Sequence, residues 1–91
     1  MKYQFDYSKQ KDLVLKETRN ISFEAVISAY KKKRKLADFE HKRKGRKYQR
    51  MLIVEIDNYA FVVPYVIDKK RKRVFLKTIY PSQKFTQQYL K

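Results

Sequence analysis

The sequence contains no cysteine, only one histidine and no long apolar run. Without cysteine, a disulfide framework and a cysteine-ligated metal site are both excluded. The single histidine, His41, also excludes a histidine-rich zinc site. We therefore expect no metal and no other cofactor.

The apolar residues are too dispersed to form a membrane anchor. No stretch approaches the roughly 20 apolar residues that a membrane-spanning helix needs, and residues 1–6 lack the apolar core of a signal peptide. We expect a cytoplasmic protein without a membrane partner. The 91 residues suit one domain spanning positions 1–91, and 43% hydrophobic residues are too many for an intrinsically disordered chain.

Positive charge is the most prominent property of the sequence. It has 24 Lys and Arg against 9 Asp and Glu, a formal net charge of +15. Sixteen of the basic residues fall in three blocks, at 31–35, 42–50 and 69–73. Self-repulsion at this level opposes compactness unless a polyanion or an acidic partner relieves it. The clustering favours a nucleic-acid or acidic protein partner; the alternative is a generally lysine-rich composition without a role.

The first third of the chain carries one strand signal and two helix signals. Residues 2–7 predict a short strand, because three aromatic side chains share one face: Tyr3, Phe5 and Tyr7. Ser8 is expected to cap a helix that runs to about Thr18. Ser22 is expected to cap a second helix, whose buried face has the helical spacing of Phe23, Val26, Ile27 and Tyr30.

The remainder predicts strands and a final helix. Residues 34–50 are the least regular part, with a short extended piece at 36–39 and a loop around Gly45, the only glycine. Strands are expected at 51–56, 59–67 and 74–80, with a tight turn at Asp57-Asn58 and a charged turn at 68–72. Pro64 suggests a bulge or a strand end within the second of these strands. Pro81-Ser82 begins a short helix with Phe85 and Tyr89 on one face.

The predicted order is therefore β-α-α-β-β-β-α. The expected class is α+β, with a short N-terminal strand and two helices, a three-stranded antiparallel meander, and a short C-terminal helix.

Three stretches resemble one known family. They are residues 5–9 (FDYSK), residues 20–26 (NISFEAV), and residues 74–80 (VFLKTIY) with the exit 81–84 (PSQK). In order and content they resemble the BrnT family of type II toxins, which share the RelE/ParE-type ribonuclease fold. The resemblance implies a bacterial toxin that cleaves messenger RNA. It also implies a cognate antitoxin with a DNA-binding domain, through which the pair would bind its operator DNA.

RNA cleavage without a metal needs a base, an acid and cations around the phosphate. His41 is the natural proton carrier near neutral pH, although it is equally compatible with an exposed loop position without a role. Lys77 interrupts an apolar strand, where it either lines a cleft as a phosphate ligand or extends from a sheet edge into solvent. Tyr48 either contacts a base or phosphate or lies in a solvated loop. The catalytic candidates are His41, Lys77, Tyr48 and Lys84.

The candidates for binding nucleic acid come from two basic and aromatic segments. The first segment lies just before the strand expected at 51–56 and contains Lys42, Arg43, Arg46, Lys47 and Arg50. The second lies near the end of the chain and contains Tyr80 and Tyr89. For Tyr89 a core position on the last helix is the alternative. The blocks at 31–35 and 69–73 are expected to give general attraction to polyanions, or to dock an acidic antitoxin segment.

Three functions compete at this point. The first is a toxin ribonuclease, and the second is a non-catalytic RNA- or DNA-binding module, which explains the charge and the tyrosines equally well. The third is a toxin of the same fold that poisons DNA gyrase, which fold alone does not separate from the first.

Overall fold

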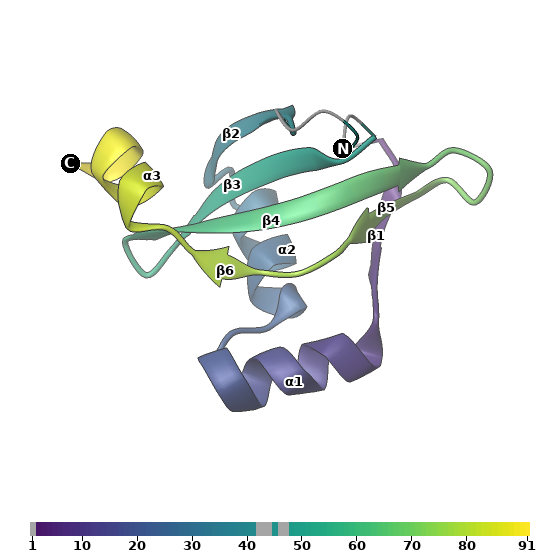
Figure 1. Cartoon of the computed structure of the whole chain (residues 1–91), viewed down its shortest axis with the longest axis horizontal. Coiled ribbons are helices and arrows are strands. Elements are labelled where there is room, and N and C mark those ends of the chain that lie inside the picture. The colour runs from purple at the N-terminus through teal and green to yellow at the C-terminus, as the bar shows by residue number, and fades with distance from the viewer. Residues whose placement is uncertain (1, 42–44, 46–47) are drawn as a thin grey trace.

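The computed structural model describes residues 2–41, 45 and 48–91. These residues form three helices and a mixed sheet of six strands (Figure 1). The elements follow the order β1 (Gln4–Tyr7), α1 (Lys9–Arg19), α2 (Phe23–Lys31), β2 (Lys35–Glu40), β3 (Arg50–Ile56), β4 (Tyr59–Asp68), β5 (Arg73–Leu76), β6 (Tyr80–Pro81) and α3 (Gln83–Leu90). The α+β class is confirmed.

The expected three-stranded meander is wrong as a description of the sheet. The strands β3, β4 and β5 do form an antiparallel succession, but the order across the sheet is β1-β5-β4-β3-β2, and β6 also pairs with β4. The N-terminal strand β1 joins the sheet parallel to β5, and β2 pairs antiparallel to β3. Both pairings join segments whose partners the local sequence pattern does not specify.

The hairpin between β3 and β4 has the predicted two-residue turn. Ile56 pairs with Tyr59, and the intervening Asp57 and Asn58 have φ values of 52° and 63°. Positive φ at both central residues suits the twist of a tight hairpin, and Asp and Asn tolerate this conformation better than most side chains. The turn fixes the register of the two central strands.

Pro64 does not end its strand, contrary to the expected bulge or strand end. β4 runs through Pro64 with continuous pairing to β3, in which Pro64 lies opposite Met51. The interruption falls in the neighbouring strand instead, because the expected strand 74–80 is divided into β5 and β6. Between them, the Lys77 N–H donates to the Pro64 carbonyl at 2.8 Å. Proline has no N–H to donate back to the neighbouring strand, so the regular hydrogen bonding between the two strands stops beside it.

The two predicted N-caps, Ser8 and Ser22, are confirmed, and Ser82 is a third N-cap. The hydroxyl oxygens of Ser8, Ser22 and Ser82 accept from the backbone N–H three residues ahead, at 3.1, 3.2 and 3.1 Å. These bonds satisfy N–H groups that a helix start leaves without a partner. The helix that follows each serine begins at the next residue.

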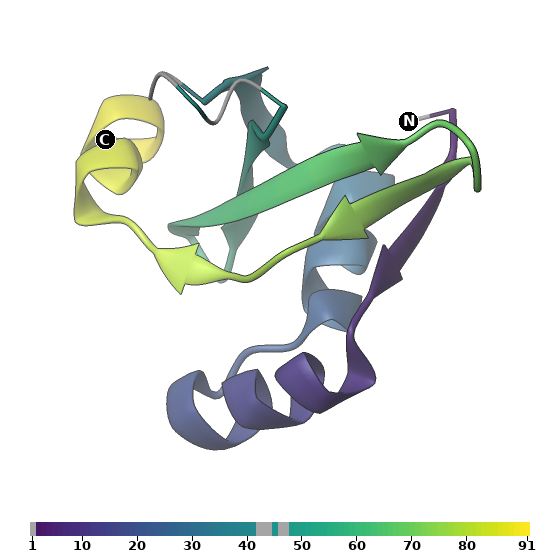
Figure 2. The same ribbon diagram turned by 45° about the vertical axis from the view of Figure 1, so that its right-hand side comes forward.

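The sheet separates two apolar clusters. On one face, Leu15 of α1 and Phe23, Val26 and Ala29 of α2 pack on the central strands. On the other face, Phe85 of α3 packs on a smaller cluster formed by Met51, Ile53, Ala60 and Val62. Figures 1 and 2 show α3 at one end of the sheet, well apart from α1. Part of the second face is therefore left uncovered by the three helices of the described residues.

None of the helices in the described part of the chain is long and apolar enough to cross a membrane.

Candidate nucleic-acid interface

One face of the sheet, here called the α3 face, collects the predicted side chains from the end of the chain. Tyr80 lies opposite Val62 in the β4–β6 pair, and Phe75 lies opposite Val66 in the β4–β5 pair. Directly paired residues share a face, and alternate residues along β4 return to it. Tyr80 and Phe75 thus project on the side where Val62 meets α3.

Lys77 also belongs to this face. Its Nζ lies 5.8 Å from the centroid of the Phe75 ring, within range of a cation–π contact. The side chain is exposed, and its backbone follows the end of β5 beside Pro64. Lys77 is therefore positioned by the interruption of the ladder, with its ammonium group accessible to a ligand.

A pocket beside α3 contains two further predicted residues. It has a volume of about 350 Å³ and is lined by Phe39, Glu40, Lys84, Phe85, Gln88 and Tyr89. The ring centroids of Phe85 and Tyr89 are 6.0 Å apart at an interplanar angle of 30°, and Phe39 lies 6.0 Å from Phe85. The Lys84 Nζ is 5.7 Å from the Phe85 ring centroid. Lysine and stacked aromatic rings thus share one hollow.

Tyr80 lies in the sequence between Lys77 and the α3 residues of the pocket, and its side chain is partly exposed. Burial raises the pKa of Tyr80 above its ordinary value. The hydroxyl therefore keeps its proton at neutral pH and is able to donate a hydrogen bond, for example to a phosphate oxygen.

The connection from β2 to β3 carries His41 and Tyr48. The His41 N–H donates to the Gln49 carbonyl at 3.0 Å, so His41 extends the β2–β3 pairing, one residue after Glu40 of the α3 pocket. Tyr48 is 68% exposed. Lys42, Arg43, Arg46 and Lys47 lie outside the described residues.

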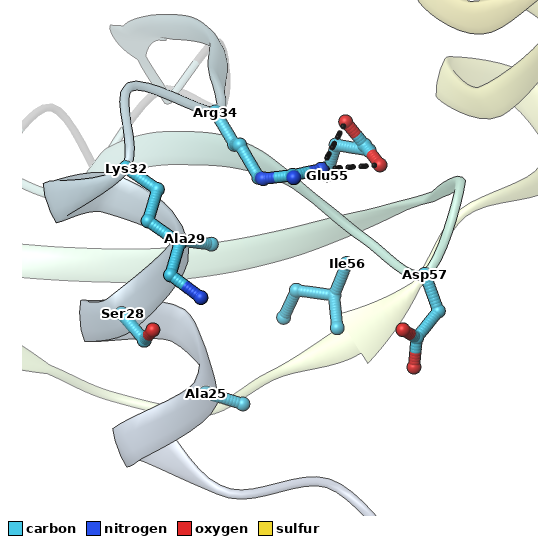
Figure 3. Close-up of a pocket in the computed structure, with 8 residues that line it drawn as sticks. All are labelled: Ala25, Ser28, Ala29, Lys32, Arg34, Glu55, Ile56 and Asp57. Carbon is cyan, nitrogen blue, oxygen red and sulfur yellow. Dashed lines mark hydrogen bonds and ion pairs between the residues drawn. The ribbon is translucent and has the colours of Figure 1, made fainter.

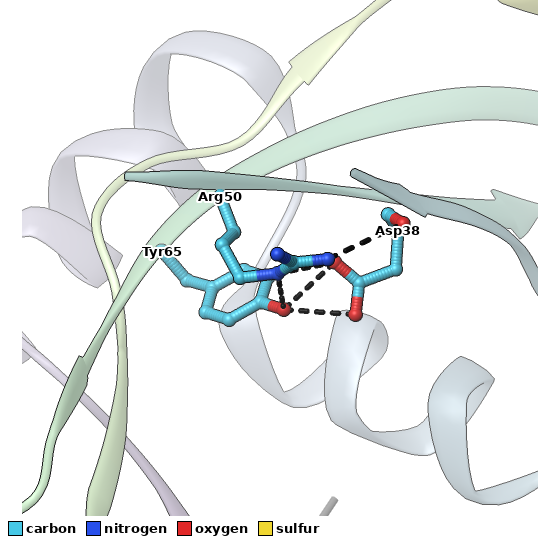
Figure 4. A network of polar contacts seen from close by, with 3 residues as sticks. All are labelled: Asp38, Arg50 and Tyr65. Atoms are coloured by element: carbon cyan, nitrogen blue, oxygen red, sulfur yellow. Dashed lines mark hydrogen bonds and ion pairs between the residues drawn. The ribbon is translucent and has the colours of Figure 1, made fainter. Parts of the chain in front are cut away.

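Arg50 occupies the opposite face of the sheet from Lys77 and Tyr80, because it pairs with Tyr65, an odd number of residues along β4 from Val62. There it meets Asp38 and Tyr65 (Figure 4). Its Nε donates to Asp38 Oδ1 at 3.2 Å and to the Tyr65 hydroxyl at 3.1 Å, and its Nη2 donates to the Asp38 carbonyl at 3.5 Å. The Tyr65 hydroxyl donates to the Asp38 carboxylate, with distances of 2.7 and 2.8 Å to the two oxygens. We call these three residues the Asp38–Arg50–Tyr65 network.

The network has clear electrostatic effects. Burial, followed by the hydrogen bond to Asp38, raises the pKa of Tyr65 to about 12. The hydrogen bond to Tyr65, and then the charge of Asp38, raise the pKa of Arg50 against the effect of burial. At neutral pH, Tyr65 is therefore a neutral donor and Arg50 a fixed cation.

A further pocket lies between α2 and the β3–β4 turn (Figure 3). Arg34, from the first basic block, crosses it to pair with Glu55, with 3.2 Å between Nη1 and Oε2. Asp57 lies on the same rim. Because acidic and basic groups balance here, this pocket contributes little to attraction of a polyanion.

Sequence patterns missed two parts of these sites. Phe85 was expected beside Tyr89 on the last helix, and Phe75 shares the face of Lys77 in an extended segment, but Phe39 was not singled out as an aromatic partner. The Asp38–Arg50–Tyr65 network joins three strands and has no local signal. Within the described residues, no group of His, Cys, Asp and Glu side chains is arranged to hold a metal ion.

Comparison of the chain with protein families, with curated proteins and with solved structures gave no match.

Proposed function

We propose that this chain binds single-stranded RNA on the α3 face and cleaves it as the toxin of a type II toxin–antitoxin pair. The observation that carries the binding proposal is the gathering of lysines and aromatic rings on one side of the sheet: Lys77 with Phe75, then Tyr80, then Lys84 with Phe85 and Tyr89. The resemblance to BrnT toxins supports the toxin role.

The arrangement suits an unpaired strand better than a duplex. Exposed aromatic side chains on a sheet stack bases that are free of a helix, and neighbouring cations hold the phosphates between them. On the α3 face the two cation–π pairs place ammonium groups beside rings, as alternating bases and phosphates require. The net charge of +15 adds attraction at longer range.

Cleavage needs only proton transfer and charge stabilisation. The 2′-oxygen of RNA attacks the adjacent phosphorus and the bond to the 5′-oxygen breaks, which leaves a 2′,3′-cyclic phosphate. One proton leaves the 2′-hydroxyl and one is delivered to the 5′-oxygen. We assign the phosphate charge to Lys77 and Lys84, proton transfer to His41, and a supporting contact to Tyr48.

Binding is tested with a charge-matched pair of variants. The double variant Lys77→Ala/Lys84→Ala should bind a short fluorescent single-stranded RNA about tenfold more weakly than the wild type. The control Lys9→Ala/Lys11→Ala removes the same charge from exposed positions on α1 and should bind within about twofold of the wild type. Equal losses in both variants would mean that net charge, and no particular face, binds the RNA.

Cleavage and toxicity are separate tests. Incubation with RNA should give products ending in a cyclic phosphate, and Lys77→Ala/His41→Ala should reduce the rate of cleavage at least about tenfold.

Expression of the chain alone should arrest growth, and co-expression with a small neighbouring antitoxin gene should relieve the arrest. RNA that is bound but intact identifies a non-catalytic binding module. Growth arrest with intact RNA and inhibited DNA supercoiling identifies a gyrase poison.

A further inference from the structure

Another pocket lies on the opposite face of the sheet from Lys77. It is open to solvent, has a volume of about 450 Å³ and is lined by Lys2, Tyr3, Asp38, Arg50, Tyr65, Ile67, Lys69 and Val74. These residues come from the start of the chain, from β2, β3, β4 and β5, and from the β4–β5 turn. We call it the Arg50 pocket.

The Arg50 pocket carries a net positive charge, and the network already holds the Arg50 side chain in place. Lys2, Arg50 and Lys69 supply three cations against the single carboxylate of Asp38. That carboxylate already accepts from the Tyr65 hydroxyl and the Arg50 Nε. Among the described residues, the network uses Nε and Nη2 of Arg50, which leaves Nη1 for another acceptor. A guanidinium held by two partners loses little freedom when it binds an anion.

The remaining wall is apolar and aromatic. Tyr3 lies beside Lys2, and Ile67 and Val74 lie on neighbouring strands next to the cations. Ile67 is 44% exposed, so its side chain is accessible to a ligand in the pocket. A phosphate alone fills only a fraction of this volume, so the pocket suits a phosphate joined to a flat, partly apolar group.

We propose that the Arg50 pocket binds a nucleotide, with its phosphate between Arg50, Lys2 and Lys69 and its base against Tyr3 and Ile67. A free mononucleotide and the phosphorylated end of an RNA strand present the same chemistry. The proposal does not rest on RNA binding by the α3 face, because the two sites use different residues on different faces.

The test uses AMP, adenosine and inorganic phosphate as probes, with binding followed by calorimetry and by NMR shifts of residues in the pocket. AMP should bind, and both fragments should bind at least about tenfold more weakly, because each lacks one half of the contact. Adenosine binding as tightly as AMP, or phosphate binding as tightly as AMP, overturns the proposal, and so does the absence of AMP binding.

Substitutions place the site without disturbing the network. Lys2→Ala/Lys69→Ala leaves Asp38, Arg50 and Tyr65 intact and should weaken AMP binding about tenfold. Lys9→Ala/Lys11→Ala has the same net charge and should leave it unchanged. An equal loss in both double variants rejects the pocket. Lys77→Ala/Lys84→Ala should also leave AMP binding unchanged, so failure of RNA binding on the α3 face is recognised separately.

Two RNA probes then identify the source of the nucleotide. If the pocket holds an RNA end, a short RNA with a 5′-phosphate should bind more tightly than its 5′-hydroxyl counterpart, and Lys2→Ala/Lys69→Ala should abolish that difference. If the two RNAs bind equally while AMP binding still depends on Lys2 and Lys69, the ligand is a free nucleotide. Both results support the proposed chemistry.

Discussion

At the scale of single residues, Tyr65 is a large side chain that the fold buries with its polar end satisfied. It is 2% exposed, and its hydroxyl meets Asp38 and Arg50 at the rim of the core. A buried hydroxyl without such partners would cost about 1–3 kcal/mol. The network therefore permits a tyrosine where apolar residues pack around the ring.

The raised pKa of Tyr65 predicts a loss of stability at high pH. The folded-state pKa of about 12 exceeds the ordinary value of 10.0, so folding favours the protonated phenol. The contribution, at most about 3 kcal/mol, is fully present below pH 10 and is lost as the pH rises from 10 towards 12. Denaturant unfolding should show the wild type losing stability relative to Tyr65→Phe across this range. A constant difference between the two proteins would contradict the assignment.

Alternation along a strand predicts only part of the α3 face. Phe75 and Lys77 lie on it together, two residues apart, as alternation requires. Alternation also places Ile79 there, but Ile79 is fully buried in the cluster on the other face, and Tyr80 lies on the α3 face because the strand is interrupted after Leu76. The partners of Arg50 could not be predicted in this way. Asp38 and Tyr65 reach it from neighbouring strands, and strand pairing is a property of the whole sheet.

At the scale of elements, Asp12 joins the two N-terminal helices. It is 7% exposed on α1, and its Oδ1 accepts from the Phe23 N–H at the start of α2 at 2.9 Å. Its Oδ2 lies 3.1 Å from the Lys16 Nζ. A carboxylate at a helix start satisfies a free N–H and interacts favourably with the helix dipole. Asp12 thus fixes the angle at which α2 follows α1.

Substitution of Asp12 should test this joint. Asp12→Ala leaves the buried Phe23 N–H without its acceptor and should lower the free energy of unfolding by about 2 kcal/mol. Asp12→Asn keeps an amide oxygen as acceptor and should lose less. Lys16→Ala breaks only an exposed pair and should cost below about 1 kcal/mol. Urea unfolding of the three variants measures the order, and an equal effect of Lys16→Ala and Asp12→Ala would assign the stability to the ion pair.

Elements with local signals were predictable, and elements defined by pairing were not. The first two helices begin where the predicted serine caps indicated, because capping is settled within four residues. β2 was expected only as a short extended piece at 36–39, because its ends, Lys35 and Glu40, are charged and give no local strand signal. Pairing with β3 extends it to six residues. The division of the last strand depends on Pro64, which lies in the neighbouring strand.

At the scale of the whole molecule, the basic blocks act at different places. The first block contributes Lys32 and Arg34 to the pocket beside Glu55, and the third contributes Lys69 to the Arg50 pocket. The middle block lies mostly outside the described residues. Composition alone indicated a polyanion partner, but the direction from which that partner approaches depends on how the sheet distributes these segments.

Net charge predicts opposite effects of salt on folding and on binding. Screening of a net charge of +15 relieves self-repulsion, so the free energy of unfolding should rise as salt is added. RNA binding should weaken over the same range, because salt opposes the release of counterions from the phosphates. Denaturant unfolding and RNA titration at matched salt concentrations measure both trends. RNA affinity that is insensitive to salt would contradict an electrostatic interface.

The pairing of β1 with β5 has a consequence for the order of events during synthesis. Gln4 is matched with Arg73 and Tyr7 with Leu76, so β1 acquires its neighbour only after the chain has been translated through β5. Contacts this distant in sequence close slowly. Until then the aromatic side of β1 stays available to chaperones or to other nascent chains, and translational pausing before the codon for Arg73 should increase aggregation.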